Sequence, residues 1–284
     1  MITKVVLNGI NFSSDGSTPF WFKKITGLES AQYRNTIVIY SDRSGATVPK
    51  QLKGQRIITL EGGLDEDSCN DHLQARRDLL TALGFNEWKE VDVYLSDGRV
   101  LRNYCKFDTP NLPVEAQTYT DFQLIMLCRY NDFDDISGGA EPNTEEVRKA
   151  VSGGWREYQG KGWREYTNKG FREYAGEGAI NAVNTGTTDA YPVIYIRGSV
   201  QNPIIRNTTT GEQFKINITT SGTDVIKIDT RLQSTTLNGG SINALVDPSS
   251  KYFTLQPGDN MLEFFSDAGT GYAEVTWIGA YGGI

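Results

Sequence analysis

Short apolar or alternating segments, each ended by Gly, Asn or Asp, constrain the fold of this sequence more than any other feature. Apolar residues at every second position predict β-strands, and the turn residues end each strand. The first group of predicted strands comprises Thr3–Leu7, Phe20–Thr26, Thr36–Tyr40, Gly54–Glu61, Val91–Leu95, Val100–Phe107 and Asp121–Tyr130. The second group comprises Tyr191–Gly198, Ile204–Asn207, Glu212–Thr219, Asp224–Asp229, Ser234–Leu237, Lys251–Leu255, Asn260–Ser266 and Tyr272–Ile278. This second group, at a spacing of about 8–12 residues, is typical of an all-β sandwich or barrel.

A single helix is predicted within the first group of strands. Its apolar stripe recurs at spacings of three and four residues and consists of Cys69, His72, Leu73, Arg76, Leu79, Leu80 and Leu83. Asp65 is the predicted N-cap, and Gly84 can take the left-handed conformation that ends a helix. Further along, Asp97 and Gly98 between two strands predict a tight hairpin turn.

The length of 284 residues and a change in composition near residue 132 indicate two domains with a connecting segment. Residues 1–132 form the first predicted domain, which is mainly β with one helix. Residues 133–178 form a linker and a repeat arm. Residues 179–284 form the second domain, which is predicted to be all β.

The connecting segment contains a repeat with a period of eight residues. Its copies are Trp155–Tyr158, Trp163–Tyr166 and Phe171–Tyr174, each an aromatic residue followed by Arg-Glu-Tyr. Two interpretations fit: aromatic packing between very short strands, or a surface for a protein partner, since Arg and aromatic residues are enriched at interface centres. The residues predicted to dock a partner are Trp155, Tyr158, Trp163, Tyr166, Phe171 and Tyr174.

The charge balance is weakly acidic, with 28 Lys and Arg against 35 Asp and Glu and a net charge of −7. A broad cationic field that would grip a phosphate backbone is therefore not expected. Cys69, Cys105 and Cys128 are an odd set without close spacing, which is not the pattern of a disulfide framework. With no leader sequence and no apolar stretch of ~18 residues in view, we expect cytoplasmic synthesis and no membrane insertion.

The sequence contains no motif for phosphate-loop, dinucleotide or hydrolase chemistry. His72, the one histidine, falls on the apolar helix stripe and is interpreted as a buried core residue. Cys69 and His72 could contact one metal ion, but no second pair of ligands has a suitable spacing. We therefore predict no catalytic residues, no metal site and no cofactor. Paired carboxylates such as Asp134 and Asp135 leave glycosidase chemistry open, because it depends on a separation in space.

Four motifs in the last hundred residues resemble, in order, those of the bacteriophage distal tail protein family, the Dit-like tail components of siphoviruses. They are Tyr191–Gly198, Asn202–Glu212, Val225–Thr230 and Phe253–Asn260. The first domain is similar to the N-terminal region of that family, which is β-rich with one Arg-containing helix, here around Gln74–Leu80. The eight-residue repeat has no counterpart there.

The resemblance implies a tail-tube-like β domain that closes into a six-fold ring, followed by a galectin-like β-sandwich. It implies a non-enzymatic hub at the tail tip of a virion or phage-derived particle, assembled in the host cytoplasm. Such a homohexamer would join the tail-tube ring to the tail-tip protein and hold receptor-binding or adhesion proteins at its periphery. DNA would only pass through the channel, and an acidic chain is compatible with this because a cationic lumen would bind phosphates.

Ring contacts are predicted at the loop that follows the strand Thr36–Tyr40. This strand and Thr3–Leu7 are expected to be sheet edges, which must be paired or blunted. Head-to-tail contacts in a ring supply such pairing. The arm-like loop Ser41–Lys53 then holds the predicted contact residues, which are Arg43, Ser44, Gly45, Ala46, Thr47 and Val48.

Two other functions stay open at this point. One is a carbohydrate-binding module or adhesin that recognises host-surface glycans, because galectin-like sandwiches elsewhere bind sugars. The other is a polysaccharide hydrolase on a β scaffold. A galectin-type site requires convergent polar side chains beside an exposed Trp. Trp277, the one Trp of the last domain, alternates with Val275 in a pattern that predicts a core-facing side chain.

Overall fold

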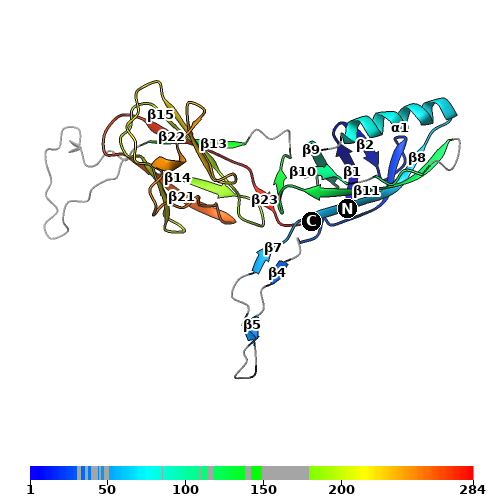
Figure 1. The fold of residues 1–284 in the computed structure, drawn as a ribbon, viewed down its shortest axis with the longest axis horizontal. Helices are drawn as coiled ribbons and strands as arrows, with labels where there is room; N and C mark the ends of the chain where they lie inside the picture. The colour runs from blue at the N-terminus through cyan, green and yellow to red at the C-terminus, as the bar shows by residue number, and fades with distance from the viewer. Residues whose placement is uncertain are drawn as a thin grey trace, which may run out of the picture. The chain divides into compact units, whose positions relative to one another are not determined.

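A computed structural model describes residues 1–30, 33–35, 38–39, 44, 46–47, 51–84, 86–108, 110–113, 118–137, 142–148 and 179–283. The chain divides into two compact units, one of Met1–Glu141 with Ala280–Ile284, the other of Pro142–Gly279. Figure 1 shows strands in both units and one α-helix among the described residues. The prediction of a mainly β chain with one helix in the N-terminal part is therefore confirmed.

The N-terminal unit is built on a nine-stranded sheet in the order β11-β8-β3-β2-β1-β9-β10-β12-β23. Its strands are β1 (Ile2–Leu7), β2 (Ile10–Ser13), β3 (Phe20–Thr26), β8 (Ile57–Asp65), β9 (Lys89–Leu95), β10 (Val100–Phe107), β11 (Tyr119–Cys128), β12 (Phe133–Asp135) and β23 (Ala280–Tyr281). Because β10 also pairs with β11, the strands from β11 to β10 close into a barrel. Alternate residues of these strands are buried in its core, as the period-two pattern predicts.

The helix α1 (Cys69–Leu83) covers less of the core than its sequence pattern predicts. His72, Leu79 and Leu83 are buried, whereas Leu73 and Leu80 are exposed. The predicted buried face of the helix is therefore too wide, because only part of the predicted apolar residues is buried. The predicted N-cap is wrong as well, because Asp65 is the last residue of β8.

Ser68 is the N-cap of α1 instead, and its hydroxyl accepts a hydrogen bond from the Asp71 backbone N–H at 3.1 Å. At the other end Gly84 has the positive φ of 41° that the sequence predicts. The Asn8 side chain donates to the Ala82 carbonyl at 2.8 Å, so one terminal carbonyl of the helix has a partner. The hairpin turn at Asp97 and Gly98 is confirmed, since β9 and β10 pair on either side of it.

Two strands of the N-terminal sheet lie outside the predicted range of residues 1–132. Phe133–Asp135 pairs with β10, and Ala280–Tyr281 pairs in turn with Phe133–Asp135. The predicted edge position of Thr3–Leu7 is wrong, because β1 lies between β2 and β9 and pairs with both. Pairing with segments distant in sequence decides which strands are central, and local pattern carries no information on it.

The C-terminal unit contains two antiparallel sheets. One has the order β13 (Asn143–Arg148), β22 (Tyr272–Trp277), β15 (Val193–Arg197), β18 (Val225–Asp229), β19 (Ser234–Leu237) and β20 (Gly240–Ser241). The other has the order β14 (Ala179–Asn184), β21 (Gly258–Phe265), β16 (Ile204–Asn207) and β17 (Glu212–Lys215). A short 3₁₀ helix, Asn243–Leu245, follows β20. Alternate residues in both sheets are buried, as in a β-sandwich.

Two details of this unit bear on the sequence-based expectations. Trp277 is buried, and its indole N–H donates to the Val183 carbonyl at 2.9 Å, which links β22 to β14 of the other sheet. The core-facing prediction for Trp277 is therefore confirmed. The predicted strand Lys251–Leu255 is wrong, because only Leu255 forms a bridge, with Ala190, and the rest lies outside any strand.

The Asp224 carboxylate holds the turn before β18. It accepts hydrogen bonds from the Ser221 N–H and hydroxyl, both at 2.8 Å, and from the Asn238 side chain at 2.9 Å. The backbone bond, then the side-chain bonds, lower the pKa of Asp224. A lowered pKa in the folded state contributes stability above the unfolded pKa, and the contribution is lost as the pH falls through the folded value.

We expect the Asp224→Asn variant to be less stable than wild type at pH 7, by a difference that shrinks as the pH falls below about 4. Chemical denaturation of both proteins across this range measures the gap. Asp259, an exposed aspartate on β21, serves as control through Asp259→Asn. If the stability difference between Asp224→Asn and wild type does not change with pH, the Asp224 charge does not have the role given to it here.

Candidate assembly surface

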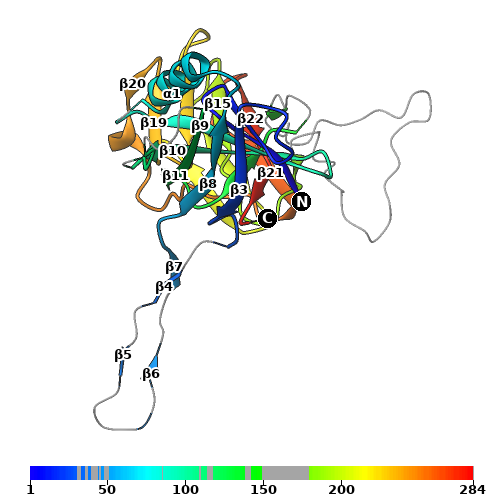
Figure 2. The same cartoon turned by 90° about the vertical axis from the view of Figure 1, so that its right-hand side faces the viewer.

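A long hairpin leaves the N-terminal barrel between β3 and β8. Its strands are β4 (Tyr33–Asn35), β5 (Val38–Ile39), β6 (Ala46–Thr47) and β7 (Gln51–Lys53), and we call residues 33–53 the arm. Thr26 lies opposite Thr59 in the barrel, Tyr33 opposite Lys53, and Val38 opposite Thr47. The pairing register thus continues almost unchanged from the barrel into the arm, so the arm extends two barrel strands (Figure 2).

The arm contains the part of the predicted ring contact that the structure describes. Ser44 is exposed, and Ala46 and Thr47 form β6, opposite Ile39 and Val38. Arg43, Gly45 and Val48 lie outside the described residues. The predicted loop is therefore in part a strand, because β6 and β7 return along β5 and β4. Whether these residues contact another subunit stays a prediction.

Apolar side chains are exposed on both faces of the hairpin. Tyr33 is 50% exposed and Leu52 is 46% exposed. Lys53, not Leu52, lies opposite Tyr33, and because successive side chains alternate between faces, Tyr33 and Leu52 lie on opposite faces. At the first residue of β8, Ile57 is 49% exposed. A two-stranded ladder that exposes such residues on both faces is only marginally stable by itself and is suited to burial against a partner.

Gly27 ends β3 where the hairpin leaves the barrel. Its φ is +87°, and a Cβ atom at this position would lie 1.9 Å from the Ile57 carbonyl oxygen. Both the backbone conformation and the close approach of the two strands therefore require glycine. Glycine thus permits the two strands to lie this close where the barrel sheet ends.

Arg56 anchors the base of the hairpin from inside the protein. Its residue exposure is only 2%. Its guanidinium donates to the backbone carbonyls of Gly27 at 2.7 Å, Glu29 at 2.6 Å, Asn131 at 2.7 Å and Gly282 at 2.6 Å. The guanidinium carbon lies 4.7 Å from the centre of the Phe133 ring, and burial lowers the pKa of Arg56. One side chain thus joins the hairpin base, the turn after β11 and the C-terminal segment.

The turn between β11 and β12 receives further bonds from this region. The buried Asn103 side chain donates to the carbonyls of Tyr130 at 3.0 Å and Asp132 at 3.1 Å. The Lys53 ammonium, at the end of β7, lies 2.6 Å from the Asp132 carboxylate. The Lys53–Asp132 ion pair therefore connects the last residue of the arm to this turn, which Asn103 in turn ties to β10.

Sequence reasoning did not identify Arg56 as a structural anchor. A signal was present, because Arg56, Ile58 and Leu60 alternate in one predicted strand, and the latter two are buried. An Arg in phase with core residues indicates a buried cation that needs several acceptors.

All residues of the eight-residue repeat lie outside the described part of the chain. This applies to Trp155, Tyr158, Trp163, Tyr166, Phe171 and Tyr174. Their proposed role in docking a partner therefore stays a prediction.

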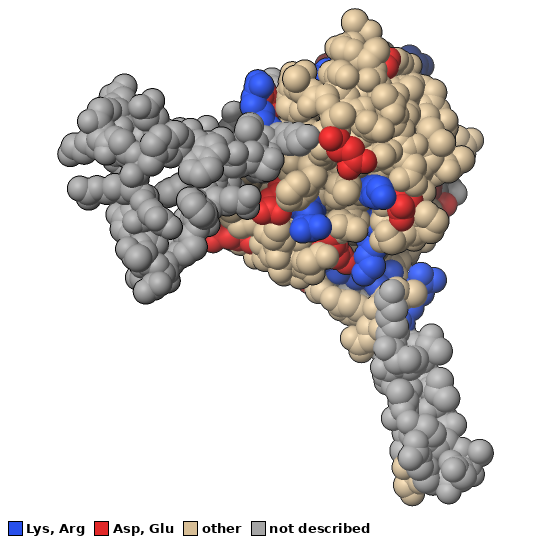
Figure 3. All heavy atoms as spheres, turned by 90° about the vertical axis from the view of Figure 1, so that its left-hand side faces the viewer, with Lys and Arg blue, Asp and Glu red and all other residues tan. Residues whose placement is uncertain are grey.

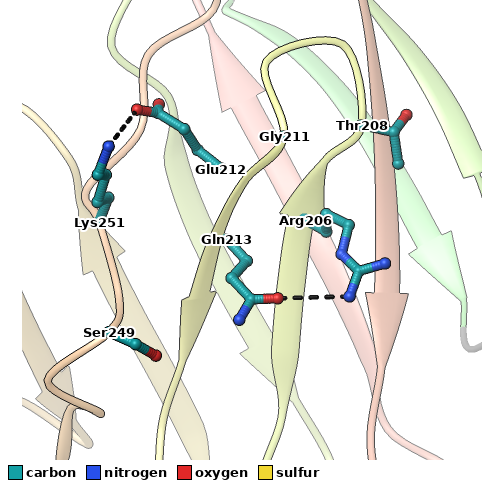
Figure 4. A pocket seen from close by; sticks show the side chains of 7 residues that line it. All are labelled: Arg206, Thr208, Gly211, Glu212, Gln213, Ser249 and Lys251. Atoms are coloured by element: carbon teal, nitrogen blue, oxygen red, sulfur yellow. Dashed lines mark hydrogen bonds and ion pairs between the residues drawn. The ribbon is translucent and has the colours of Figure 1, made fainter.

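A shallow polar hollow of about 620 Å³ lies on the C-terminal unit (Figure 4). It is lined by Arg206, Thr208, Gly211, Glu212, Gln213, Ser249 and Lys251. Its cations have partners within the hollow, since Lys251 lies 3.2 Å from Glu212 and Arg206 donates to Gln213 at 3.4 Å. This lining has no aromatic ring on which a sugar could stack. On the face drawn in Figure 3, basic and acidic side chains are interspersed without a broad patch of one sign.

His72 has the environment of a core residue. Its Nε2 lies 2.9 Å from the Thr120 hydroxyl, and both residues are buried. Within the described ranges, no group of three or more His, Cys, Asp or Glu side chains is arranged to hold a metal ion. In the same ranges, no helix has the length and apolar character needed to cross a membrane.

The chain thus forms a barrel with a long hairpin, followed in sequence by a unit of two antiparallel sheets. Residues 185–281 match the family model for the siphovirus-type tail component, C-terminal domain. No curated protein matches the sequence. Together the model match and the fold confirm the resemblance to the Dit-like distal tail proteins.

Two solved phage structures share the fold at low sequence identity. The SPP1 Dit protein, described as a paradigm of the hub adsorption apparatus in phages that infect Gram-positive bacteria, has a TM-score of 0.65 and 13% identity, with 99% of each chain covered. A chain of the phage P2 baseplate in its activated conformation with Ca has a TM-score of 0.50 and 10% identity, with 98% of each chain covered. The likeness to both extends over nearly the whole chain.

Proposed function

We propose that this chain forms a homohexameric ring at the tip of a siphovirus-type tail. The ring joins the tail tube to the tail-tip protein, and its galectin-like outer domain holds receptor-binding or adhesion proteins. The role is structural and non-enzymatic, and DNA passes through the channel without being gripped. Assembly takes place in the host cytoplasm and the protein ends in the virion. Support comes from the tail-component family model and from the fold shared with SPP1 Dit.

The observation that carries the ring proposal is the arm with its anchored base. Its described residues expose apolar side chains on both faces, while Arg56, Gly27 and Lys53 fix its origin on the barrel. A neighbouring subunit that receives the arm in a groove would bury Tyr33 on one face and Leu52 on the other. Heterologous contacts of this kind repeat until the rotation closes, which gives a ring.

We expect the double variant Tyr33→Ser, Leu52→Ser to shift the protein from rings to monomers at micromolar concentration. Each side chain contributes roughly 1–2 kcal/mol of burial at each interface, so the affinity per contact falls at least tenfold. Mass photometry and multi-angle light scattering measure the distribution of assembly states.

Leu232→Ser is the matched control, because Leu232 is 52% exposed in a turn of the C-terminal unit and is not part of the arm. It should leave the ring intact. Wild-type protein that is monomeric with the tail-tube protein present would contradict the hexamer. Rings that persist in the double variant would show that the arm does not carry the contact.

A further inference from the structure

The barrel closes along a short ladder between β10 and β11, which we call the seam. It contains three residue pairs: Cys105 opposite Cys128, Lys106 opposite Leu127 and Phe107 opposite Met126. Before this ladder β10 pairs with β12, so the strand changes partners at the seam. The closure of the barrel therefore depends on few backbone hydrogen bonds.

The two cysteines at the seam are placed directly against each other. Their Sγ atoms are 3.0 Å apart, and the two residues are 23 positions apart in sequence. Both thiols are free, Cys105 is fully buried, and Cys128 is 5% exposed. Both belong to the core of the N-terminal unit.

Backbone hydrogen bonds define the type of this cross-strand pair. The Cys128 N–H donates not to Cys105 but to the carbonyl of Arg56, the residue before β8, at 3.0 Å. The next N–H, that of Arg129, donates to the carbonyl of Tyr104 on β10 at 2.7 Å. Cys105 and Cys128 are thus a non-hydrogen-bonded pair, in which Cα atoms lie about 4.5 Å apart. This separation is within the range that a disulfide spans, and the sulfur atoms need to approach by only about 1 Å.

We propose that Cys105 and Cys128 are a latent disulfide site that cross-links the barrel seam when the protein meets a peroxide. The biological setting rests on the proposed function, since a tail component leaves the reducing cytoplasm for oxidising surroundings. The exposed Cys69 lies elsewhere, at the start of α1, and takes no part.

The reaction balances with hydrogen peroxide as the oxidant. The Cys128 sulfur attacks one peroxide oxygen, so an S–O bond forms, the O–O bond breaks and water leaves after proton transfer. The Cys105 sulfur then attacks the sulfenic sulfur, so the S–S bond forms, the S–O bond breaks and a second water leaves. Two thiols lose two electrons in total, and one peroxide gains them.

The environment of the pair makes this reaction slow and selective. The hydrogen bond to Cys128 and burial raise the pKa of the Cys105 thiol, whereas the nearby Arg56 guanidinium acts in the opposite direction. The Cys105 thiolate is therefore scarce at neutral pH, and oxidation should accelerate as the pH rises. In the reducing cytoplasm the pair stays reduced.

The test uses the full chain with Cys69→Ser, which leaves the two seam thiols. After treatment with hydrogen peroxide and quenching, the protein is denatured, alkylated and weighed without reductant. We expect a mass loss of two hydrogens, no alkylation, and a peptide that links Cys105 to Cys128. The thermal midpoint should rise by roughly 5–10 °C and return when dithiothreitol is added.

The matched control adds Cys128→Ala, which should abolish both the cross-link and the shift. Two alkylated thiols after treatment, or added oxygen atoms in place of lost hydrogens, would overturn the proposal. A cross-link without a rise in the thermal midpoint would also overturn it, because the disulfide would then not stabilise the seam. Thiol counts do not depend on ring formation, so mass photometry of the same samples tests the proposed function separately.

Discussion

Replacing Arg56 with Met is expected to lower the free energy of unfolding of the N-terminal unit by about 3–5 kcal/mol. Met has a similar length and fills much of the same space, but it donates no hydrogen bond. The carbonyls of Gly27, Glu29, Asn131 and Gly282 would lose the donor that the guanidinium gives them. The cost is large because one buried cation makes all four of these charge-assisted hydrogen bonds.

Arg77→Met is the matched control, because Arg77 lies on the exposed side of α1 and undergoes the same chemical change. It should alter stability by less than about 0.5 kcal/mol. Denaturant unfolding, with native-state hydrogen exchange to assign the affected strands, measures both variants. If the two variants are equally stable, water replaces the hydrogen bonds of the Arg56 guanidinium without loss of stability. Arg56→Lys should rescue little, since one ammonium cannot reach carbonyls on three separate segments.

Removing residues 280–284 is expected to destabilise the N-terminal unit by on the order of 3–5 kcal/mol while leaving the C-terminal unit unchanged. The deletion removes β23 from β12 and takes away the buried Ala280 and Tyr281. It also removes the Gly282 carbonyl from Arg56 and the Tyr281 ring, 5.1 Å from the guanidinium of Arg99. Hydrogen exchange should therefore increase in β10 and β12 and stay constant in β15 and β18.

A shorter deletion of residues 283 and 284 is the control for this experiment. It keeps β23 and the acceptor for Arg56, so protection in β12 should change little. If the longer deletion affects β15 and β18 as strongly as β12, the last residues stabilise the whole chain and not the N-terminal unit alone.

Much of the fold follows from local patterns in the sequence. Phe20–Thr26, Val100–Phe107, Ile204–Asn207 and Ser234–Leu237 are strands with the predicted bounds. Alternation identifies these strands because each has one buried face. The turn at Asp97 and Gly98 is predicted for a similar local reason, since glycine permits the positive φ of 89° there.

The assembly surface and the cysteine pair depend on contacts that local patterns do not contain. The partners of Arg56 come from three segments, the most distant 226 residues away. Cys105 and Cys128 both occupy inward positions of their strands, which was visible as alternation. Their opposition depends on the register of β10 against β11, which the sequence does not specify. The short strands β12 and β23 have too few residues to show any period.

The return of β23 to the N-terminal sheet has a consequence for protein synthesis. The ribosome produces Ala280 and Tyr281 only after every strand of the C-terminal unit. Domains generally fold as units in the order of their synthesis, but here the sheet of the first unit is completed only after the strands of the second unit have been made. A nascent chain therefore presents β12 without its outer neighbour and Arg56 without its last acceptor. Any message truncated within the second half would yield a chain whose first unit also lacks a strand of its sheet.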